Sequence, residues 1–171
     1  ALVAIGETSP RGNDRPVPGV QPSETPGRFA QRLAAIKGLK FDAWAHHPYP
    51  TSPNLPPTQK VRWPNVTLLQ LSRFETSIDQ WFHRRGIPVW ITEYGHETKP
   101  GEPHGVTEAQ QAKYLPQAIS IAKKDARVPM FVWFVFRDST GNPWQSGIYR
   151  RTGARKPAQP KWASAAKPLD M

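Results

Sequence analysis

The sequence has 171 residues, of which 37% are hydrophobic and 21% are charged, so its composition indicates a folded globular domain and excludes an intrinsically disordered chain. It contains no cysteine, which excludes disulfide bonds and a cysteine nucleophile, and no apolar run approaches the ~20 residues of a membrane-spanning helix. The formal net charge is +10, but the 23 Lys and Arg residues are spread along the chain, which favours a solvated basic surface over a nucleic-acid-binding stripe.

Two strands and one helix are predicted in the first third of the chain. Residues 1–6 (ALVAIG) form an apolar run that predicts a buried strand, and the proline- and glycine-rich residues 7–26 predict a long loop. Apolar residues at helical spacing predict a helix over 27–38. Residues 41–46 predict a second strand, and another proline-rich loop over 47–64 follows it.

The middle of the chain predicts a long helix followed by a short strand. One apolar stripe runs through residues 66–85, and Gly86 would end this helix. Residues 89–92 are apolar and predict the third strand.

The last third predicts two further helices around a fourth strand. A helix should begin near Thr107, whose hydroxyl can cap it, and Pro116 should kink that helix or remove one of its hydrogen bonds. Residues 130–136 (MFVWFVF) predict the fourth strand, and Trp162 falls in a short final helix.

Strands and helices therefore alternate along the whole chain. Near-continuous apolar strands are typical of parallel sheets, in which helices cover the strands, and each crossover should be right-handed. The predicted fold class is α/β with parallel βα repeats, and we expect one domain over residues 1–171.

Polar and aromatic side chains follow each predicted strand. These residues are Glu7 after the first strand, His46, His47 and Tyr49 at the second, Glu93 and Tyr94 at the third, and Arg137 and Asp138 at the fourth. The carboxyl ends of parallel strands share one edge, where α/β folds place their active sites. Two carboxylates with aromatic rings at a common mouth suit glycosyl transfer, because one carboxylate attacks and another group protonates the leaving oxygen.

Several of these side chains also have a purely structural interpretation. Glu93 could pair with a Lys or Arg at the strand end, and Glu7 could pair with Arg11. A tryptophan at position 133 is more often a core residue than a sugar platform, whereas Trp144 lies in a loop where it could stack on a substrate.

The histidines give no metal-binding pattern. His46 and His47 are adjacent in a strand and point to opposite faces, so they should not share an ion, and we predict neither a metal nor a cofactor. His47 and Tyr49 are two residues apart and share a face, which suits either a substrate-facing pair or a packed His and Tyr.

Five segments together resemble the retaining (β/α)8-barrel glycoside hydrolases of the large cellulase-like clan. Residues 88–95 (PVWITEYG) are similar to the seventh strand of that barrel and residues 45–49 (AHHPY) to the sixth. Residues 132–138 (VWFVFRD) resemble the eighth strand, and residues 147–158 resemble the run that ends in Lys-Pro-Ala. Residues 6–12 (GETSPRG) are similar to the end of the fifth strand in bacterial members.

The resemblance implies a role for each side chain at the predicted mouth. Glu93 would be the nucleophile, and Glu7 is a further carboxylate that could serve as acid/base. The side chains that we expect to bind substrate are His47, Tyr49, Tyr94, Trp133, Arg137 and Trp144.

The first four strands of the (β/α)8 barrel have no counterpart in the resemblance. The clan's acid/base is a Glu preceded by Asn at the end of the fourth strand, and the sequence contains no Asn-Glu pair. We therefore expect a partial barrel, strands five to eight, trimmed from a longer chain, with its acid supplied by Glu7 or by a missing segment. Such a half would expose an apolar face and two strand edges, so we expect it to associate with a second copy or with an amino-terminal half barrel.

The predicted function is hydrolysis of β-linked oligosaccharides or polysaccharides with retention, by this chain or by the enzyme of which it is a truncated form. One alternative is a non-catalytic carbohydrate-binding relic of such a barrel, and another is a polyanion binder attracted by the net charge. The resemblance favours a secreted bacterial protein whose partner is carbohydrate, with no nucleic-acid or membrane partner.

Overall fold

The computed structural model describes residues 1–142 and 144–166. Within this part of the chain, four strands alternate with helices in the predicted order. The elements are β1 (Ala4–Thr8), α1 (Pro26–Leu33), β2 (Ala43–His46), the short 3₁₀ helix η1 (Leu68–Gln70), α2 (Leu71–Trp81), β3 (Val89–Tyr94), α3 (Glu108–Lys123), β4 (Met130–Trp133) and α4 (Ala158–Ala165). No helix in the described residues is long and apolar enough to cross a membrane.

The four strands form one parallel sheet in the order β1-β2-β3-β4. Each strand pairs with the next one along the chain: Ala4 lies opposite Ala43, Trp44 opposite Val89, and Trp90 opposite Met130. A parallel sheet built from successive βα units is the arrangement of a (β/α)8 barrel, here with four of its strands, so the predicted fold class is confirmed.

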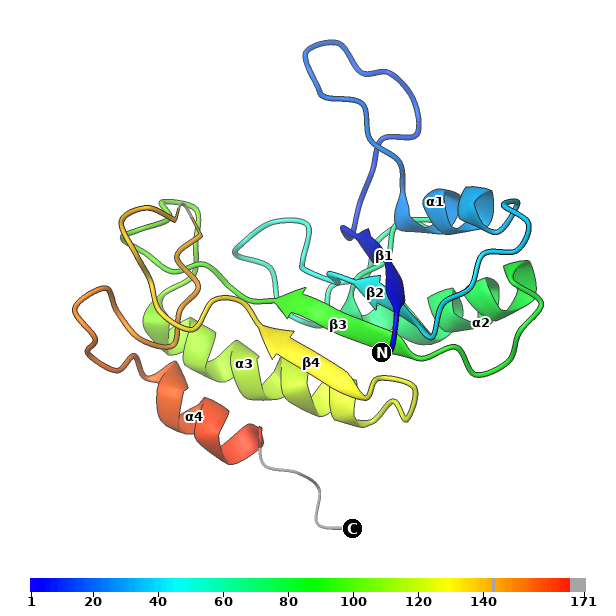
Figure 1. Cartoon of the computed structure of the whole chain (residues 1–171). Helices are drawn as coiled ribbons and strands as arrows, with labels where there is room; N and C mark the ends of the chain where they lie inside the picture. The colour runs from blue at the N-terminus through cyan, green and yellow to red at the C-terminus, as the bar shows by residue number, and fades with distance from the viewer. Residues whose placement is uncertain (143, 167–171) are drawn as a thin grey trace.

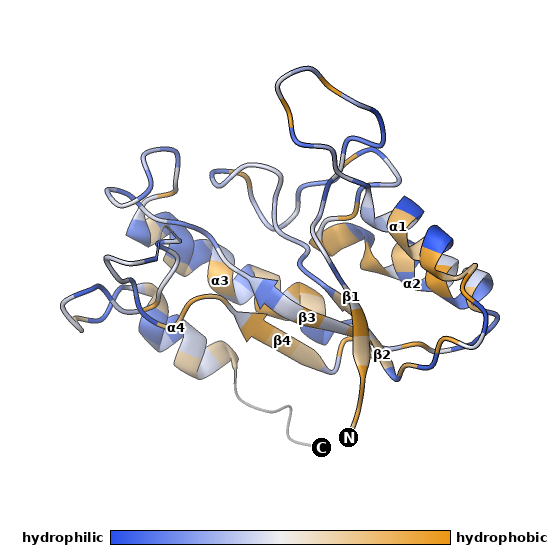
Figure 2. Cartoon of the chain, turned by 45° about the horizontal axis from the view of Figure 1, so that its top comes forward, coloured by the Kyte–Doolittle hydropathy of each residue, from blue (hydrophilic) through white to orange (hydrophobic). Residues whose placement is uncertain are grey.

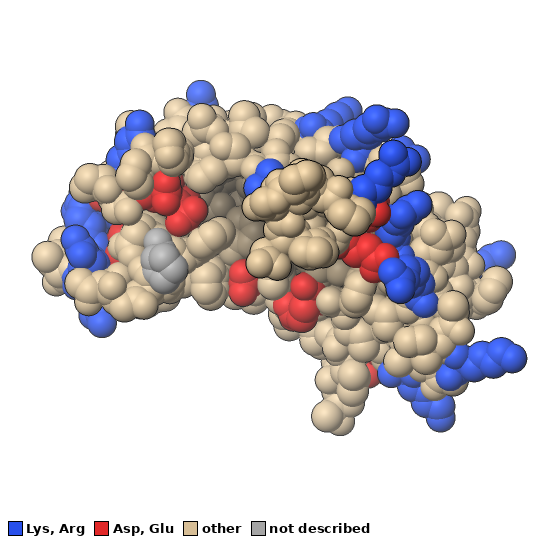
Figure 3. All heavy atoms as spheres, turned by 90° about the horizontal axis from the view of Figure 1, so that it is seen from above, with Lys and Arg blue, Asp and Glu red and all other residues tan. Residues whose placement is uncertain are grey.

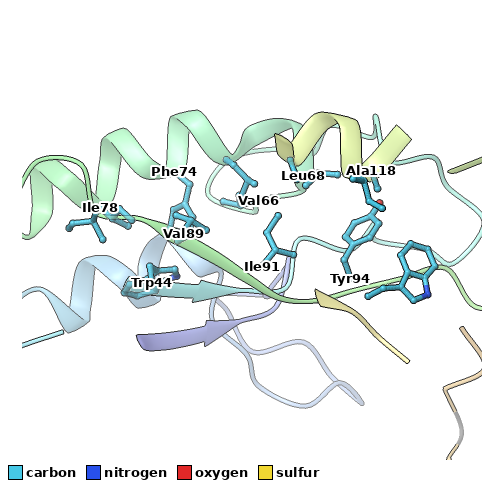
Figure 4. Packing of buried hydrophobic residues seen from close by; sticks show 14 of the residues in the cluster. Trp44, Val66, Leu68, Phe74, Ile78, Val89, Ile91, Tyr94 and Ala118 are labelled. Carbon is cyan, nitrogen blue, oxygen red and sulfur yellow. The ribbon is translucent and has the colours of Figure 1, made fainter. Parts of the chain in front are cut away.

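The core lies between one face of the sheet and the helices. Trp44, Val89 and Ile91 point from the strands toward α2, whose Phe74 and Ile78 are fully or almost fully buried against them (Figure 4). The cluster continues into α3 and α4, so a single apolar core holds the described elements together.

The other face of the sheet is open (Figure 1). Along β4, Phe131 and Trp133 pack into the core, whereas the alternating residues Met130 and Val132 remain 37% and 41% exposed. The hydropathy colouring shows β1 and β4 largely as apolar ribbons, with no helix of the described chain in front of them (Figure 2). In a complete barrel this face would line the packed interior.

Several element boundaries differ from the predicted ones. The first strand begins at Ala4, because Leu2 and Val3 are exposed rather than buried, and the third continues past Thr92 to Tyr94. The fourth ends at Trp133, because the amide of Val135 turns away to donate to the hydroxyl of Ser146.

The helices over the first two predicted ranges are shorter than their apolar patterns predicted, and α2 ends at Trp81 rather than at Gly86, whereas the cap at Thr107 is as expected. The predicted helix over 66–85 is divided into η1 and α2. Thr107 accepts a hydrogen bond from the amide of Gln110 at 3.1 Å and caps α3, and α3 continues through Pro116 to Lys123.

Two buried histidines should make the fold sensitive to acid. Burial lowers the pKa of His46 and of His96 to about 4, and both side chains are almost completely inaccessible. His46 bonds Thr8 through Nδ1 and the carbonyl of Val66 through Nε2, a pattern that suits the neutral ring.

Stability should therefore fall as the pH drops from about 6.5 to about 4, because the unfolded chain takes up protons that the folded chain excludes. Each histidine can contribute up to about 3 kcal/mol to this loss. Urea unfolding of the wild type across this range should show the trend, and His96→Gln should flatten the curve while the exposed His104→Gln leaves it unchanged. Equal slopes for wild type and His96→Gln would contradict the assignment.

Candidate active site

Glu93 lies at the carboxyl end of β3, and an irregularity in that strand turns its side chain away from the core. Strict alternation would place residue 93 on the same face as the buried Val89 and Ile91. The register between β3 and β4 shifts between Ile91 and Tyr94, so Tyr94 takes the buried position. The Glu93 side chain is left 34% exposed at the rim of the sheet.

Two groups from the end of β2 approach one oxygen of Glu93. The Tyr49 hydroxyl donates a hydrogen bond to Glu93 Oε2 at 3.2 Å. His47 Nδ1 lies 3.6 Å from the same oxygen, which is too long for a hydrogen bond but close enough for electrostatic attraction. The carboxylate is therefore held in one orientation by a phenol and faces an imidazole.

Glu7, at the end of β1, lies on the far side of the same imidazole. His47 Nε2 is 2.6 Å from Glu7 Oε2, and the Thr92 hydroxyl donates to that oxygen at 3.2 Å. A single ring thus lies between two carboxylates, and we call Glu7, His47, Tyr49 and Glu93 the carboxylate cluster. The sequence alternative that paired Glu7 with Arg11 is not what the structure shows.

Tyr49 lies in an aromatic pocket that keeps its hydroxyl protonated. Its ring stacks on Tyr94 with centroids 5.8 Å apart and meets Trp144 edge to face at 5.4 Å. Burial raises the pKa of Tyr49 far above its ordinary value, and the charge of Glu93 raises it further. The phenol consequently acts as a hydrogen-bond donor to the carboxylate at all ordinary pH values.

A cavity of about 460 Å³ opens beside the cluster. His47, Tyr49, Glu97 and Trp144 line it together with residues of two loops, 9–11 and 50–53. Its size is in the range of small-molecule sites, and aromatic and polar side chains share its wall. Seen from above, the molecule has a curved outline with acidic side chains near its concave edge and Lys and Arg mostly on the outer rim (Figure 3).

Gly95 is required where the chain passes from β3 into this wall. A Cβ atom at this position would lie 2.3 Å from the carbonyl oxygen of Phe134, a distance that no side chain tolerates. The glycine after Tyr94 therefore allows the chain to pass close to the end of β4 and line the cavity.

Three of the side chains that we expected to contact substrate lie elsewhere. Tyr94 is fully buried and points toward Leu68 and Ala118 (Figure 4), and Trp133 is 7% exposed and donates its indole N–H to the carbonyl of Ser146. Arg137 is exposed in the segment after β4 and is not among the cavity-lining residues. Tyr94 and Trp133 thus support the site from the core side: the register shift after Ile91 turns Tyr94 toward the helices, and Trp133 shares the core-facing side of β4 with Phe131.

The two adjacent histidines point to opposite faces, as predicted. His46 is fully buried beside Phe74, and His47 faces the carboxylate cluster. Among residues 1–142 and 144–166, no group of three or more His, Asp or Glu side chains could hold a metal ion.

A parallel βα sheet with carboxylates at the carboxyl ends of its strands is the architecture of barrel-type glycoside hydrolases. The model of the family described as glycosyl hydrolase catalytic core matches residues 32–154, and the chain belongs to this family. No curated protein matches the chain by sequence.

Solved structures agree on the fold. A GH128 (subgroup I) endo-beta-1,3-glucanase from Amycolatopsis mediterranei, in complex with laminarihexaose, superposes with a TM-score of 0.51 at 20% identity and covers 81% of this chain and 50% of its own. A family 39 glycoside hydrolase from Bacteroides cellulosilyticus gives 0.52 at 22% identity, over 74% of this chain and 27% of its own. A GH2 beta-galacturonidase from Eisenbergiella tayi gives 0.52 at 15% identity, over 77% and 26%. This chain therefore spans half or less of the length of these enzymes.

Proposed function

We propose that this chain is the catalytic carboxyl-terminal half of a retaining glycoside hydrolase for β-linked glucans or related polysaccharides, with Glu93 as its nucleophile. The observation that carries the proposal is the hydrogen bond from the Tyr49 hydroxyl to Glu93 Oε2 beside the cavity. This bond orients the carboxylate beside a substrate-sized cavity, which is the arrangement that the nucleophile of a glycosidase needs.

The reaction would proceed in two displacements. Glu93 attacks the anomeric carbon while the glycosidic oxygen departs with a proton, which gives a covalent glycosyl–enzyme. Water then attacks the same carbon and gives a proton to the group that protonated the leaving oxygen, and the bond to Glu93 breaks. Tyr49 keeps the attacking oxygens aligned, and His47 holds the adjacent edge of the cavity through its bond to Glu7.

Glu7 is poorly arranged to be the acid of the first step. Its Oε2 accepts from the Thr92 hydroxyl and lies 2.6 Å from His47 Nε2, so this oxygen is already engaged by two groups, and Glu7 is not among the residues that line the cavity. Its side chain is also 60% exposed. We infer that the acid comes from a segment outside this chain, which would supply the remaining strands of the barrel.

The open face of the sheet supports this half-barrel proposal. β1 and β4 are unpaired edges of the described sheet, and Met130, Val132 and Phe136 expose apolar surface at the second of them. Size-exclusion chromatography with light scattering should therefore show dimers or larger species, or a monomer that binds a hydrophobic dye strongly. A compact monomer that binds no dye would contradict the proposal.

Covalent trapping tests the nucleophile directly. A 2-deoxy-2-fluoro-β-glucoside with a dinitrophenyl leaving group needs no acid to react, and its fluorine slows hydrolysis of the intermediate. Peptide mass spectrometry should find the fluoroglucosyl mass on the peptide that contains Glu93. A label on another carboxylate, or no label, would remove Glu93 from this role.

A carbohydrate-binding protein without catalysis is the second candidate, and the arrangement of Glu7 as an acceptor favours it. It predicts oligosaccharide binding in the cavity of residues 47 and 49 without labelling of Glu93. The trapping experiment therefore separates the two functions.

A further inference from the structure

Glu97 is a second acidic side chain of the cavity, and the carboxylate cluster does not use it. It lies four residues after Glu93, in the loop that leaves β3, and it lines the same cavity as Trp144. The residue is only 9% exposed, and within the described chain it has no Lys or Arg within ion-pair distance. A nearly buried acid without a cationic partner is costly, which indicates that it serves a ligand.

The loop that carries Glu97 is fixed by bonds on both sides of that residue. The Glu97 carbonyl accepts from the amide of Val106 at 2.9 Å, and the next residue, Thr98, donates its amide to the carbonyl of Gln145 at 3.0 Å. The Thr98 hydroxyl accepts from the buried ammonium of Lys156 at 2.8 Å. The position of the acid is therefore set by the core and does not depend on a bound ligand.

The two sides of this loop pack closely at Gly105, where a larger residue would not fit. A Cβ atom at Gly105 would lie 2.5 Å from the carbonyl oxygen of Glu97. The backbone of residue 97 therefore lies directly against the segment at residue 105, and the Glu97 side chain lines the cavity.

Aromatic surface lines the same cavity as this acid. Trp144 lines the same cavity and packs edge to face against Tyr49, which itself bonds Glu93. Burial, and then the neighbouring Glu102, raise the pKa of Glu97, whereas a hydrogen bond with the backbone of Gln145 lowers it. A partly satisfied carboxyl group and an indole in the wall of one cavity match a pyranose, which offers hydroxyl donors at its edge and C–H groups on its face.

We propose that Glu97 and Trp144 form a sugar-binding subsite next to the reaction centre, in which the Glu97 carboxylate accepts two neighbouring hydroxyl groups of one sugar unit. The subsite rests on the proposed glycosidase function of the same cavity. It selects neutral sugars with free vicinal hydroxyls, and it disfavours units that carry acetyl or other ester groups at those positions.

The test compares Glu97→Gln with Glu102→Gln, which removes the same charge from the same loop outside the cavity lining. Laminaritriose, cellotriose and xylotriose are titrated against each protein by calorimetry. For the tightest of these ligands, Glu97→Gln should raise the Kd about tenfold or more, because hydrogen bonds to a charged group are lost. Glu102→Gln should leave the Kd within about twofold, and Glu97→Asp, which retains the charge, should recover part of the loss.

Thermal unfolding of each variant shows whether the fold is retained, and removing a poorly solvated charge should not destabilise it. An analogue of the best ligand that lacks one of the two neighbouring hydroxyl groups should bind the wild type weakly. Its affinity should fall little further in Glu97→Gln. Unchanged binding by Glu97→Gln overturns the subsite, as does a wild type that is labelled at Glu93 yet binds none of the three sugars. Absence of labelling at Glu93 is a separate result, which overturns the glycosidase function itself.

Discussion

Glu93→Gln should abolish covalent labelling and slow the turnover of a dinitrophenyl β-glycoside on the order of 10⁴-fold or more, as expected when the nucleophile of a two-step reaction is removed. The amide is nearly the same size and still accepts the Tyr49 hydrogen bond, so the cavity should persist while the attacking group is lost. Initial rates of dinitrophenolate release measure the effect. Glu24→Gln, which changes an exposed residue paired with Arg32, is the matched control and should retain full activity.

Azide distinguishes a lost nucleophile from a damaged site. In Glu93→Ala the removed side chain leaves room for a small anion, which can attack the anomeric carbon of the β-glycoside from the vacated side. The product should be the α-glycosyl azide, identified by NMR, because a single displacement inverts the configuration. A β-glycosyl azide, or full activity in Glu93→Gln, would show that Glu93 has another role.

Asp138→Ala should destabilise the fold by about 3–5 kcal/mol, because it leaves the ammonium of Lys156 buried without its counter-ion. Lys156 Nζ lies 2.6 Å from Asp138 Oδ2, and the two side chains are 1% and 9% exposed. The other oxygen of Asp138 accepts the amide of Gly147 at 2.7 Å, so the substitution also frees a buried donor. Urea unfolding followed by tryptophan fluorescence measures the change.

Two further variants test whether the unpaired charge of Lys156 causes the loss of stability in Asp138→Ala. The double variant Asp138→Ala/Lys156→Met removes both charges and should be more stable than Asp138→Ala alone. Glu24→Ala breaks an exposed pair and should change the free energy of unfolding by at most about 1 kcal/mol. If Asp138→Ala costs no more than Glu24→Ala, the buried pair contributes little and the loop of Glu97 is held by other contacts.

The sequence predicted the alternation of elements well, because the apolar patterns are long and their ends are marked. Val89 and Ile91 fall at buried strand positions, and Thr107 supplies the cap of α3. The alternating order of strands and helices predicted that the strands pair in parallel. Parallel strands have their carboxyl ends at one edge of the sheet, so the sequence also predicted that Glu7, His47 and Glu93 lie close together there.

The details of the site depended on local backbone geometry that no periodicity encodes. The register shift between Ile91 and Tyr94 exchanges the faces of Glu93 and Tyr94, which is why Tyr94 was expected at the sugar and is found in the core. Glu97 was not among the residues expected to bind substrate, because it lies in a loop with no spacing motif. The signal that could have found it is its position, since loops after the carboxyl ends of barrel strands build the active site.

The pairing of each strand with its immediate successor has a consequence for how such a molecule can arise and assemble. Each pair of strand partners is separated by one βα unit, as in Ala4 and Ala43, Trp44 and Val89, and Trp90 and Met130. The strands can therefore pair one after another while the chain is being synthesised. If the gene were divided between two βα units, all strand pairs within each of the two encoded pieces would be retained. Units of this kind are suited to duplication, fusion and exchange, and a library that joins these four strands to foreign βα units would create new pairings only at β1 and β4, the outer strands of the described sheet.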